Sequence, residues 1–123
     1  MPETPRTEYL YHYKARIVDV YDGDTVYADI DLGLSTWIHR EKIRLARIDA
    51  PEIHGKERAA GLRSWEYIRK LLLGKEVLLV TIKDRRGKYG RYLGEIWLQE
   101  NGTWINVNDR MMEAGMAEPY RPK

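Results

Sequence analysis

Three short segments of this chain combine carboxylates, arginines and glycines in patterns that could support metal or phosphate chemistry. The first is Asp22-Gly23-Asp24-Thr25, which predicts a turn followed by a carboxylate at the start of a strand. Such a carboxylate could bind a hard cation, but calcium takes about 6–8 oxygen ligands, so one aspartate is not enough. On its own, the segment is also explained as a turn between two strands.

The second segment, residues 43–52 with the sequence IRLARIDAPE, carries arginines inside an apolar strand pattern. A buried guanidinium needs hydrogen-bond partners, so this pattern is unusual. The segment then delivers Asp49 and Glu52 at its C-terminal end. An edge strand with solvated arginines and a polar turn would give the same pattern.

The third segment is Lys88-Tyr89-Gly90-Arg91, in which Gly90 and the preceding Gly87 allow sharp turns. Alone, it is an ordinary charged hairpin whose last arginine opens the next strand. Tyr120, close to the C-terminus, is a further candidate, although a packing role would explain it equally well.

The surrounding pattern predicts the elements that position these segments. Alternating or apolar runs predict strands, helical spacing of Leu62, Trp65, Ile68 and Leu72 predicts a helix over 57–73, and Asn106 can cap a short C-terminal helix. The expected strands cover 9–20, 26–32, 37–48, 77–82 and 91–98. This order predicts a mainly β (α+β) fold, a five-stranded OB-type Greek-key barrel with a helix after strand three. We expect residues 1–8 to form a flexible arm and 9–123 a single domain.

Composition narrows the chemistry further. The chain has 123 residues and no cysteine, which excludes disulfides and thiolate metal sites and favours hard cations. The net charge of +2 does not by itself indicate nucleic acid, but basic residues crowd 83–91 and acidic residues recur in 19–31. With neither an apolar run of membrane-spanning length nor a signal-peptide core, we expect a soluble protein, either cytoplasmic or the mature form of a secreted one.

Taken together, D-G-D-T, I-R-L-A-R-I-D-A-P-E and K-Y-G-R occur in an order and spacing that resembles the thermonuclease (staphylococcal-nuclease-like) family over residues 9–120. The resemblance implies a calcium-dependent nuclease that hydrolyses phosphodiester bonds of DNA or RNA and leaves 3′-phosphates. An OB barrel favours unpaired strands, whose bases can spread onto aromatic side chains. We expect a monomer without membrane attachment.

The resemblance also implies a metal site. Asp24 and Asp49 would be carboxylate ligands of calcium, and the main-chain carbonyl of Ala50 would be a third ligand. Family members often have threonine where this chain has Ala50, a change that a carbonyl ligand survives. Asp22 would lie near the metal as a supporting carboxylate.

The same resemblance implies the residues that act on substrate. Arg44 and Arg91 would contact the scissile phosphate, and Glu52 would orient or deprotonate the attacking water. Lys88 and Tyr89 would bind the terminal phosphate of the nucleotide.

Two regions depart from the family pattern. The sequence AEPY makes the base-stacking role of Tyr120 an open question, and the loop over 33–41 (GLSTWIHRE) leaves substrate access open. A catalytically silent OB module that only binds nucleic acid or protein is the alternative function, and a structural barrel in a larger assembly is a third. The complete carboxylate–arginine set favours the enzyme.

Overall fold

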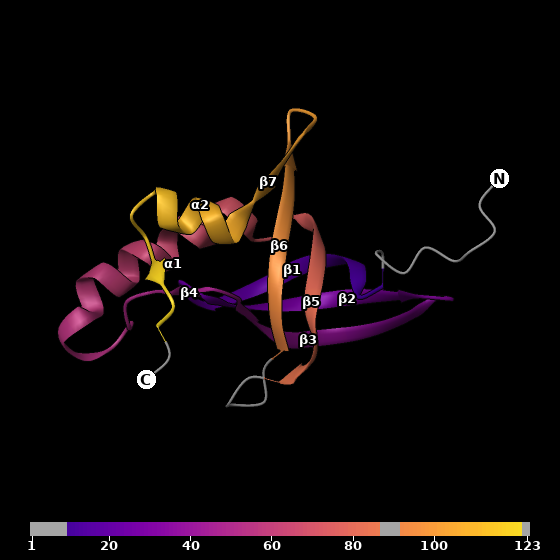
Figure 1. The fold of residues 1–123 in the computed structure, drawn as a ribbon, viewed down its shortest axis with the longest axis horizontal. Coiled ribbons are helices and arrows are strands. Elements are labelled where there is room, and N and C mark those ends of the chain that lie inside the picture. The colour runs from indigo at the N-terminus through magenta and orange to yellow at the C-terminus, as the bar shows by residue number, and fades with distance from the viewer. Residues whose placement is uncertain (1–9, 87–91, 122–123) are drawn as a thin grey trace.

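Five strands form a closed barrel in the computed structural model, which describes residues 10–86 and 92–121. The barrel strands are β1 (His12–Asp22), β2 (Thr25–Gly33), β3 (Thr36–Leu45), β5 (Glu76–Arg86) and β6 (Tyr92–Glu100). β1 pairs antiparallel with both β2 and β5, β2 pairs with β3, and β5 pairs with β6. A parallel pairing of β3 with β6 closes the ring (Figure 1). The predicted five-stranded OB-type barrel is confirmed.

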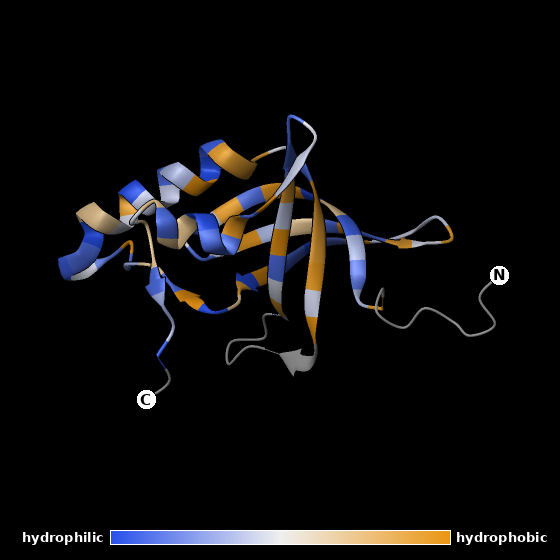
Figure 2. Ribbon diagram, turned by 45° about the horizontal axis from the view of Figure 1, so that its top comes forward, coloured by the Kyte–Doolittle hydropathy of each residue, from blue (hydrophilic) through white to orange (hydrophobic). Residues whose placement is uncertain are grey.

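The barrel core follows from the alternation of the strands. Ile17, Ile43, Leu79 and Ile96 come from four different strands and are at most 1% exposed. Apolar and polar residues alternate along the barrel strands in Figure 2, as expected when one face of each strand points inward. The core therefore fixes which side chains of each strand face outward.

A helix lies at one end of the barrel, where the 3-10 turn η2 (Gly55–Glu57) leads into α1 (Arg58–Leu72) (Figure 1). Ile68 and Leu72 are buried as predicted, but Leu62 is 37% exposed. Instead, Gly61 is buried against the backbone of Glu52 and Ile53, and Ser64 is buried against Gly23. The apolar spacing predicted the helix correctly but placed its buried face slightly off, because two small residues allow the closest packing.

The predicted third strand is interrupted before Asp49. β3 ends at Leu45, the backbone turns at Arg47 with a φ of 72°, and β4 (Ile48–Asp49) then pairs with β8 (Glu118–Pro119). The prediction of one strand through Ile48 is therefore wrong. In the turn, the Ala46 N–H donates to the Gly94 carbonyl of β6 over 2.9 Å.

The other boundaries shift by a few residues. β1 begins at His12 because Tyr11 adopts a positive φ of 66°. β5 continues beyond the predicted end at Ile82. No helix within residues 10–86 and 92–121 is long and apolar enough to span a membrane.

The C-terminal elements follow the predicted turn at residues 101–102. β7 (Thr103–Asn106) pairs with β6, and α2 (Val107–Glu113) follows at once. The Asn106 side chain accepts a hydrogen bond from the Asp109 N–H over 2.8 Å, which confirms the predicted N-cap. The proposed arm at 1–8 lies outside the described residues, and the single-domain assignment stays a prediction.

Candidate functional site

The Arg44 guanidinium brings two of the predicted carboxylates together. Its Nη2 atom lies 3.4 Å from Oδ2 of Asp24 and 3.3 Å from Oδ1 of Asp49. Asp24 directly precedes β2, Arg44 lies one residue before the end of β3, and Asp49 is the last residue of β4. Three separate segments therefore converge on one nitrogen atom, with the two carboxylates on the same side of the guanidinium.

Arg44 is held in this position by the backbone of the turn that follows it. Its Nη1 atom donates to the carbonyls of Leu45, over 2.9 Å, and Ile48, over 3.0 Å. The Arg44 side chain is only 13% exposed. The partners that a buried guanidinium requires are thus main-chain carbonyls at both ends of the turn.

Asp24 is the most buried carboxylate at the site, with its side chain 8% exposed. Its Oδ2 accepts the Ala50 N–H over 2.9 Å, and its Oδ1 accepts the Thr25 hydroxyl over 3.1 Å. The neighbouring Gly23 allows this closeness, because a Cβ there would lie 2.7 Å from the Cβ atoms of both Ala50 and Ser64. The backbone of Ala50 is therefore fixed beside Asp24.

Asp22 adds negative charge next to Asp24. Its Oδ1 accepts the Asp24 N–H over 3.0 Å. Burial, together with the charge of Asp24, raises the pKa of Asp22 to about 7. Asp22 therefore keeps its proton up to about neutral pH, because a second buried negative charge beside Asp24 is unfavourable.

Tyr120 reaches the same group from the C-terminus. The Arg44 guanidinium carbon lies 5.6 Å from the centre of the Tyr120 ring, and this ring is half exposed. The Tyr120 N–H donates to the Arg47 carbonyl over 2.8 Å, next to the β4–β8 pair. Tyr120 is therefore part of the cluster, while its predicted stacking on a base stays a prediction.

Glu52 is positioned through its main chain. Its N–H donates to Oε1 of Glu57 over 3.1 Å, and the helix passes so close at Gly61 that a Cβ there would overlap the Glu52 carbonyl. The side chain is exposed, and within the described residues it makes no hydrogen bond or ion pair. Its carboxylate is thus exposed, and no contact among the described residues joins it to the cluster.

Three predicted site residues, Lys88, Tyr89 and Arg91, lie outside the described residues. Their roles at the phosphate stay predictions from the sequence.

The carboxylate oxygens of the cluster fit a hard cation that keeps some of its water ligands. Asp24 and Asp49 face one positive group, and burial next to the charge of Asp24 raises the pKa of Asp22, so a cation bound there would favour the charged form of Asp22. The described residues contain no group of three or more His, Cys, Asp or Glu side chains placed to hold a metal. A calcium ion at this site would therefore need main-chain, water or substrate oxygens as well.

The support of the turn at 45–48 was not predicted from the sequence. Asn108 is fully buried, donates from Nδ2 to the carbonyls of Ala46 and Gly94 over 2.9 and 3.0 Å, and accepts the Ile96 N–H over 3.1 Å. An asparagine two residues after a capping asparagine carries no distinctive sequence pattern. Its role is visible only once α2 packs against β6.

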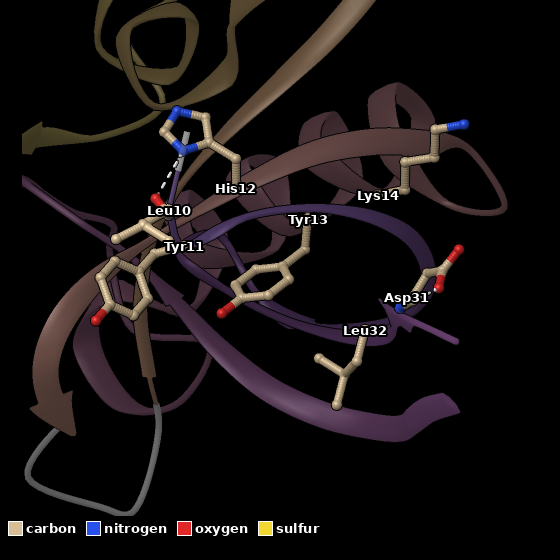
Figure 3. Close-up of a pocket in the computed structure, with 8 residues that line it drawn as sticks. Leu10, Tyr11, His12, Tyr13, Lys14, Asp31 and Leu32 are labelled. Carbon is tan, nitrogen blue, oxygen red and sulfur yellow. Dashed lines mark hydrogen bonds between the residues drawn. The ribbon is translucent and has the colours of Figure 1, made fainter. Parts of the chain in front are cut away.

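A separate hollow of about 440 Å³ lies where the start of β1 meets the end of β2 (Figure 3). The side chains of Tyr11, Tyr13 and Leu32 project to the same side of this strand pair in the figure. None of the predicted site residues lines the hollow. The candidate site thus lies apart from this hollow, at the opposite, helix-covered end of the barrel.

The sequence profile of the family described as Staphylococcal nuclease homologue matches residues 42–123, which include Arg44, Asp49 and Tyr120. The chain belongs to this family. The match begins inside β3, so the hairpin that β3 forms with β2 lies largely outside it.

Curated relatives agree with this assignment. The chain is 32% identical to an uncharacterised protein of Methanocaldococcus jannaschii over 89% of its own length and 60% of that protein. It is 35% identical to a protein of Haemophilus influenzae named as an uncharacterised endonuclease, over 86% of this chain and 52% of the relative. It is 25% identical to the thermonuclease of Staphylococcus hyicus over 87% of this chain and 60% of the relative. The chain thus spans little more than half the length of these relatives.

Proposed function

We propose that this chain is a calcium-dependent nuclease that hydrolyses phosphodiester bonds in single-stranded DNA or RNA. The observation that carries the proposal is the convergence of Asp24 and Asp49 on Nη2 of Arg44. Two carboxylates for a divalent ion and one guanidinium for a phosphate are the parts that this hydrolysis needs, since its transition state gathers negative charge on the phosphoryl oxygens. The endonuclease and thermonuclease names of two relatives agree with this chemistry.

Arg44 suits phosphate binding for reasons of geometry and charge. Its guanidinium is anchored through Nη1 to two carbonyls, which leaves the Nη2 side facing the carboxylates, where a phosphate oxygen would lie. A guanidinium stays protonated and presents a rigid fork of donors, which lysine does not. With Arg91 as the second predicted clamp, the two arginines would stabilise the charge that develops on phosphorus.

Asp24, Asp49 and the Ala50 carbonyl would hold the calcium ion, which would supply positive charge at the scissile phosphate. Glu52 would accept a proton from the attacking water, and this water would add to phosphorus as the 5′-oxygen leaves. The products would carry 3′-phosphates. Tyr120, half exposed beside Arg44, would stack on a base next to the cleaved bond.

Digestion of single-stranded DNA with calcium, with magnesium and with a chelator tests the proposal. We expect cleavage with calcium and none with the chelator. Glu52→Gln should lower the rate at least about 100-fold, while the matched variant Glu66→Gln, on the exposed face of α1, should not. Binding of DNA without cleavage under every condition would instead identify a catalytically silent module.

A further inference from the structure

The outer face of β3 carries a row of side chains that leads away from Arg44. Ile43 and Leu45 are fully buried in the barrel, so Lys42 and Arg44, which alternate with them, point outward. Lys42 pairs across the ladder with Tyr27, and its Nζ lies 5.7 Å from the Tyr27 ring centre. Lys42 is thus the next outward residue after the candidate phosphate ligand.

The row continues through a bulge. Arg40 has a positive φ of 56°, and its guanidinium carbon lies 4.5 Å above the Tyr27 ring. The Arg40 N–H donates to Asp29 over 2.8 Å, while Nδ1 of His39 lies 3.4 Å from the other oxygen of the same carboxylate. The bulge therefore turns both His39 and Arg40 to the outer side.

The row ends in two stacked rings on the β2–β3 hairpin. Leu34 and Ser35, with φ of 55° and 60°, form its tight turn. Trp37 is 46% exposed, and its ring lies parallel to that of His39, with centroids 6.4 Å apart and planes 7° from parallel. The hairpin end lies on the opposite side of the molecule from α1 and β4 (Figure 1). The row thus spans from the candidate site to the far end of the barrel.

The charges on this face are sorted by strand. The outer rows of β1 and β2 carry Asp19, Asp29 and Asp31 together with Arg16, whereas the outer row of β3 carries no acid. Asp19 is paired with Arg40 over 2.9 Å, so the charge of Arg40 is offset within the fold. Glu41 pairs with the buried Ala28 and so belongs to the other face. Among the described residues Lys42 has no carboxylate partner. An anion on this face would therefore be attracted first to Lys42, the cation of the row whose charge no described carboxylate offsets.

The β3 edge beyond this row is also open. Within residues 10–86 and 92–121, β6 pairs only with Ile43–Leu45 of β3, so β2 is the one described strand neighbour of residues 36–42. Arg40 and Lys42 could simply protect that edge against pairing with another strand. Edge protection does not explain why an exposed tryptophan and a parallel imidazole lie in line with the cations.

We propose that the outer row of β3, formed by Trp37, His39, Arg40, Lys42 and Arg44, is a track that binds single-stranded nucleic acid on one side of the cleaved bond. One part of this inference rests on the proposed function, namely that the phosphate at Arg44 is the one that is cleaved. Alternate residues of a strand are about 6.7 Å apart, which suits successive phosphates of an extended single strand. Cations along the backbone path and aromatic rings for bases are the two components of single-strand binding surfaces. The rings require unstacked bases, so a duplex would not use them.

Binding in a chelator, where no cleavage takes place, tests the track directly. Fluorescence anisotropy of a labelled single-stranded DNA dodecamer should show about tenfold weaker binding for Trp37→Ala, since stacking on one ring contributes about 1–3 kcal/mol. The control is Trp104→Ala, because Trp104 is similarly exposed, at 51%, on β7. Trp37→Tyr should restore binding and Trp37→Leu should not. A Leu variant that binds as well as the Tyr variant would overturn the stacking role.

The charge of the track is tested with Lys42→Gln against Lys70→Gln, an exposed lysine of α1. Lys42→Gln removes one phosphate contact, so the slope of log affinity against log salt concentration for the dodecamer should decrease by about one. Lys70→Gln should leave this slope unchanged. A dinucleotide, too short to extend from Arg44 to Trp37, should bind all variants equally.

The two proposals fail in different ways. If the chain cleaves nothing but Trp37→Ala and Lys42→Gln still weaken dodecamer binding, the track stands and the nuclease assignment fails. If the chain cleaves DNA while both variants bind like their controls, the track is wrong and the nuclease stands. Far-ultraviolet circular dichroism of each variant shows whether it is folded, and both positions are at the surface.

Discussion

Arg44 and Arg47 flank the same turn, yet their guanidinium groups have different surroundings. Arg47 binds Glu95 through two short contacts, of 2.7 and 2.8 Å, and Asp109 over 2.9 Å. These hydrogen bonds raise the pKa of Arg47 still further above its usual range. Arg44 instead shares longer contacts, of 3.3 and 3.4 Å, between two carboxylates, with Asp22 crowded behind them. Each arginine thus has two carboxylate partners, but only at Arg44 does a third carboxylate, that of Asp22, lie behind them.

This difference separates a structural ion pair from a candidate catalytic group. At Arg47, the guanidinium and both carboxylates are paired over short distances within the fold. At Arg44, two carboxylates share one nitrogen over longer distances, so a cation that bound their oxygens would release Nη2 for an anion. If the comparison is correct, variants at the two positions will affect different measurements.

Substitution of each arginine by lysine should separate the two roles most widely. Arg44→Lys should lower calcium-dependent cleavage at least about 100-fold, because one ammonium cannot replace donors that are fixed toward the phosphate. Arg47→Lys should cost about 1 kcal/mol of unfolding free energy at this half-exposed pair, with cleavage within tenfold of wild type. Rate and denaturation measurements on both variants check this. Equal loss of cleavage in both would remove the distinction between the two arginines.

Asn108 should be the residue on which the turn between the arginines most depends for stability. Asn108→Ala leaves the carbonyls of Ala46 and Gly94 and the Ile96 N–H without their buried partner. The Gly94 carbonyl keeps the Ala46 N–H, so two groups lose their partner at about 1–3 kcal/mol each, and urea unfolding should show a decrease of at least about 2 kcal/mol. Asn106→Ala, which removes a helix cap, should cost only about 1 kcal/mol. A smaller decrease for Asn108→Ala than for Asn106→Ala would contradict the assigned role of Asn108.

The burial of Asp22 beside Asp24 should make the stability of the metal-free protein depend on pH. The pKa of Asp22 is about 7 in the folded chain against 3.8 for an ordinary aspartate, so the folded state retains a proton that the unfolded state has lost. Stability therefore falls as pH rises from about 4 to 7. Asp22→Asn should reduce the decrease in unfolding free energy between about pH 4 and 7. Asp109→Asn, which removes a carboxylate partner of Arg47, should not. Unfolding in a chelator across pH 4–8 tests this, and an unchanged slope in Asp22→Asn would argue against the crowding.

The barrel and the Arg44 cluster were largely predictable from local sequence. Strand alternation, the helical stripe and the cap at Asn106 gave the order of elements, and Asp24, Arg44 and Asp49 lie together as the first two motifs suggested. These features depend on residues close in the chain or on a recurring motif. Consecutive strands usually pair with one another, so the order of the elements predicts most of the strand pairings in the barrel.

The supports of the site were not predictable, because they join residues far apart in the sequence. Asn108 contacts a turn 62 residues earlier, and Gly61 is glycine because the backbone of Glu52 passes against it. The break of β3 at Arg47 likewise depends on a carbonyl from β6. A single sequence does not reveal which polar residue will be buried against which backbone group.

The most direct test of the central claim is calcium affinity, measured by isothermal titration calorimetry in the presence of a nuclease-resistant single-stranded oligonucleotide. Asp49 is the suitable position, because its side chain is 61% exposed and its replacement should not disturb the core. We expect Asp49→Asn to weaken calcium binding at least about tenfold, since it removes one of two carboxylate ligands, and Asp109→Asn to leave it unchanged. Wild-type affinity in Asp49→Asn, or an equal loss in Asp109→Asn, would contradict a metal site at Arg44.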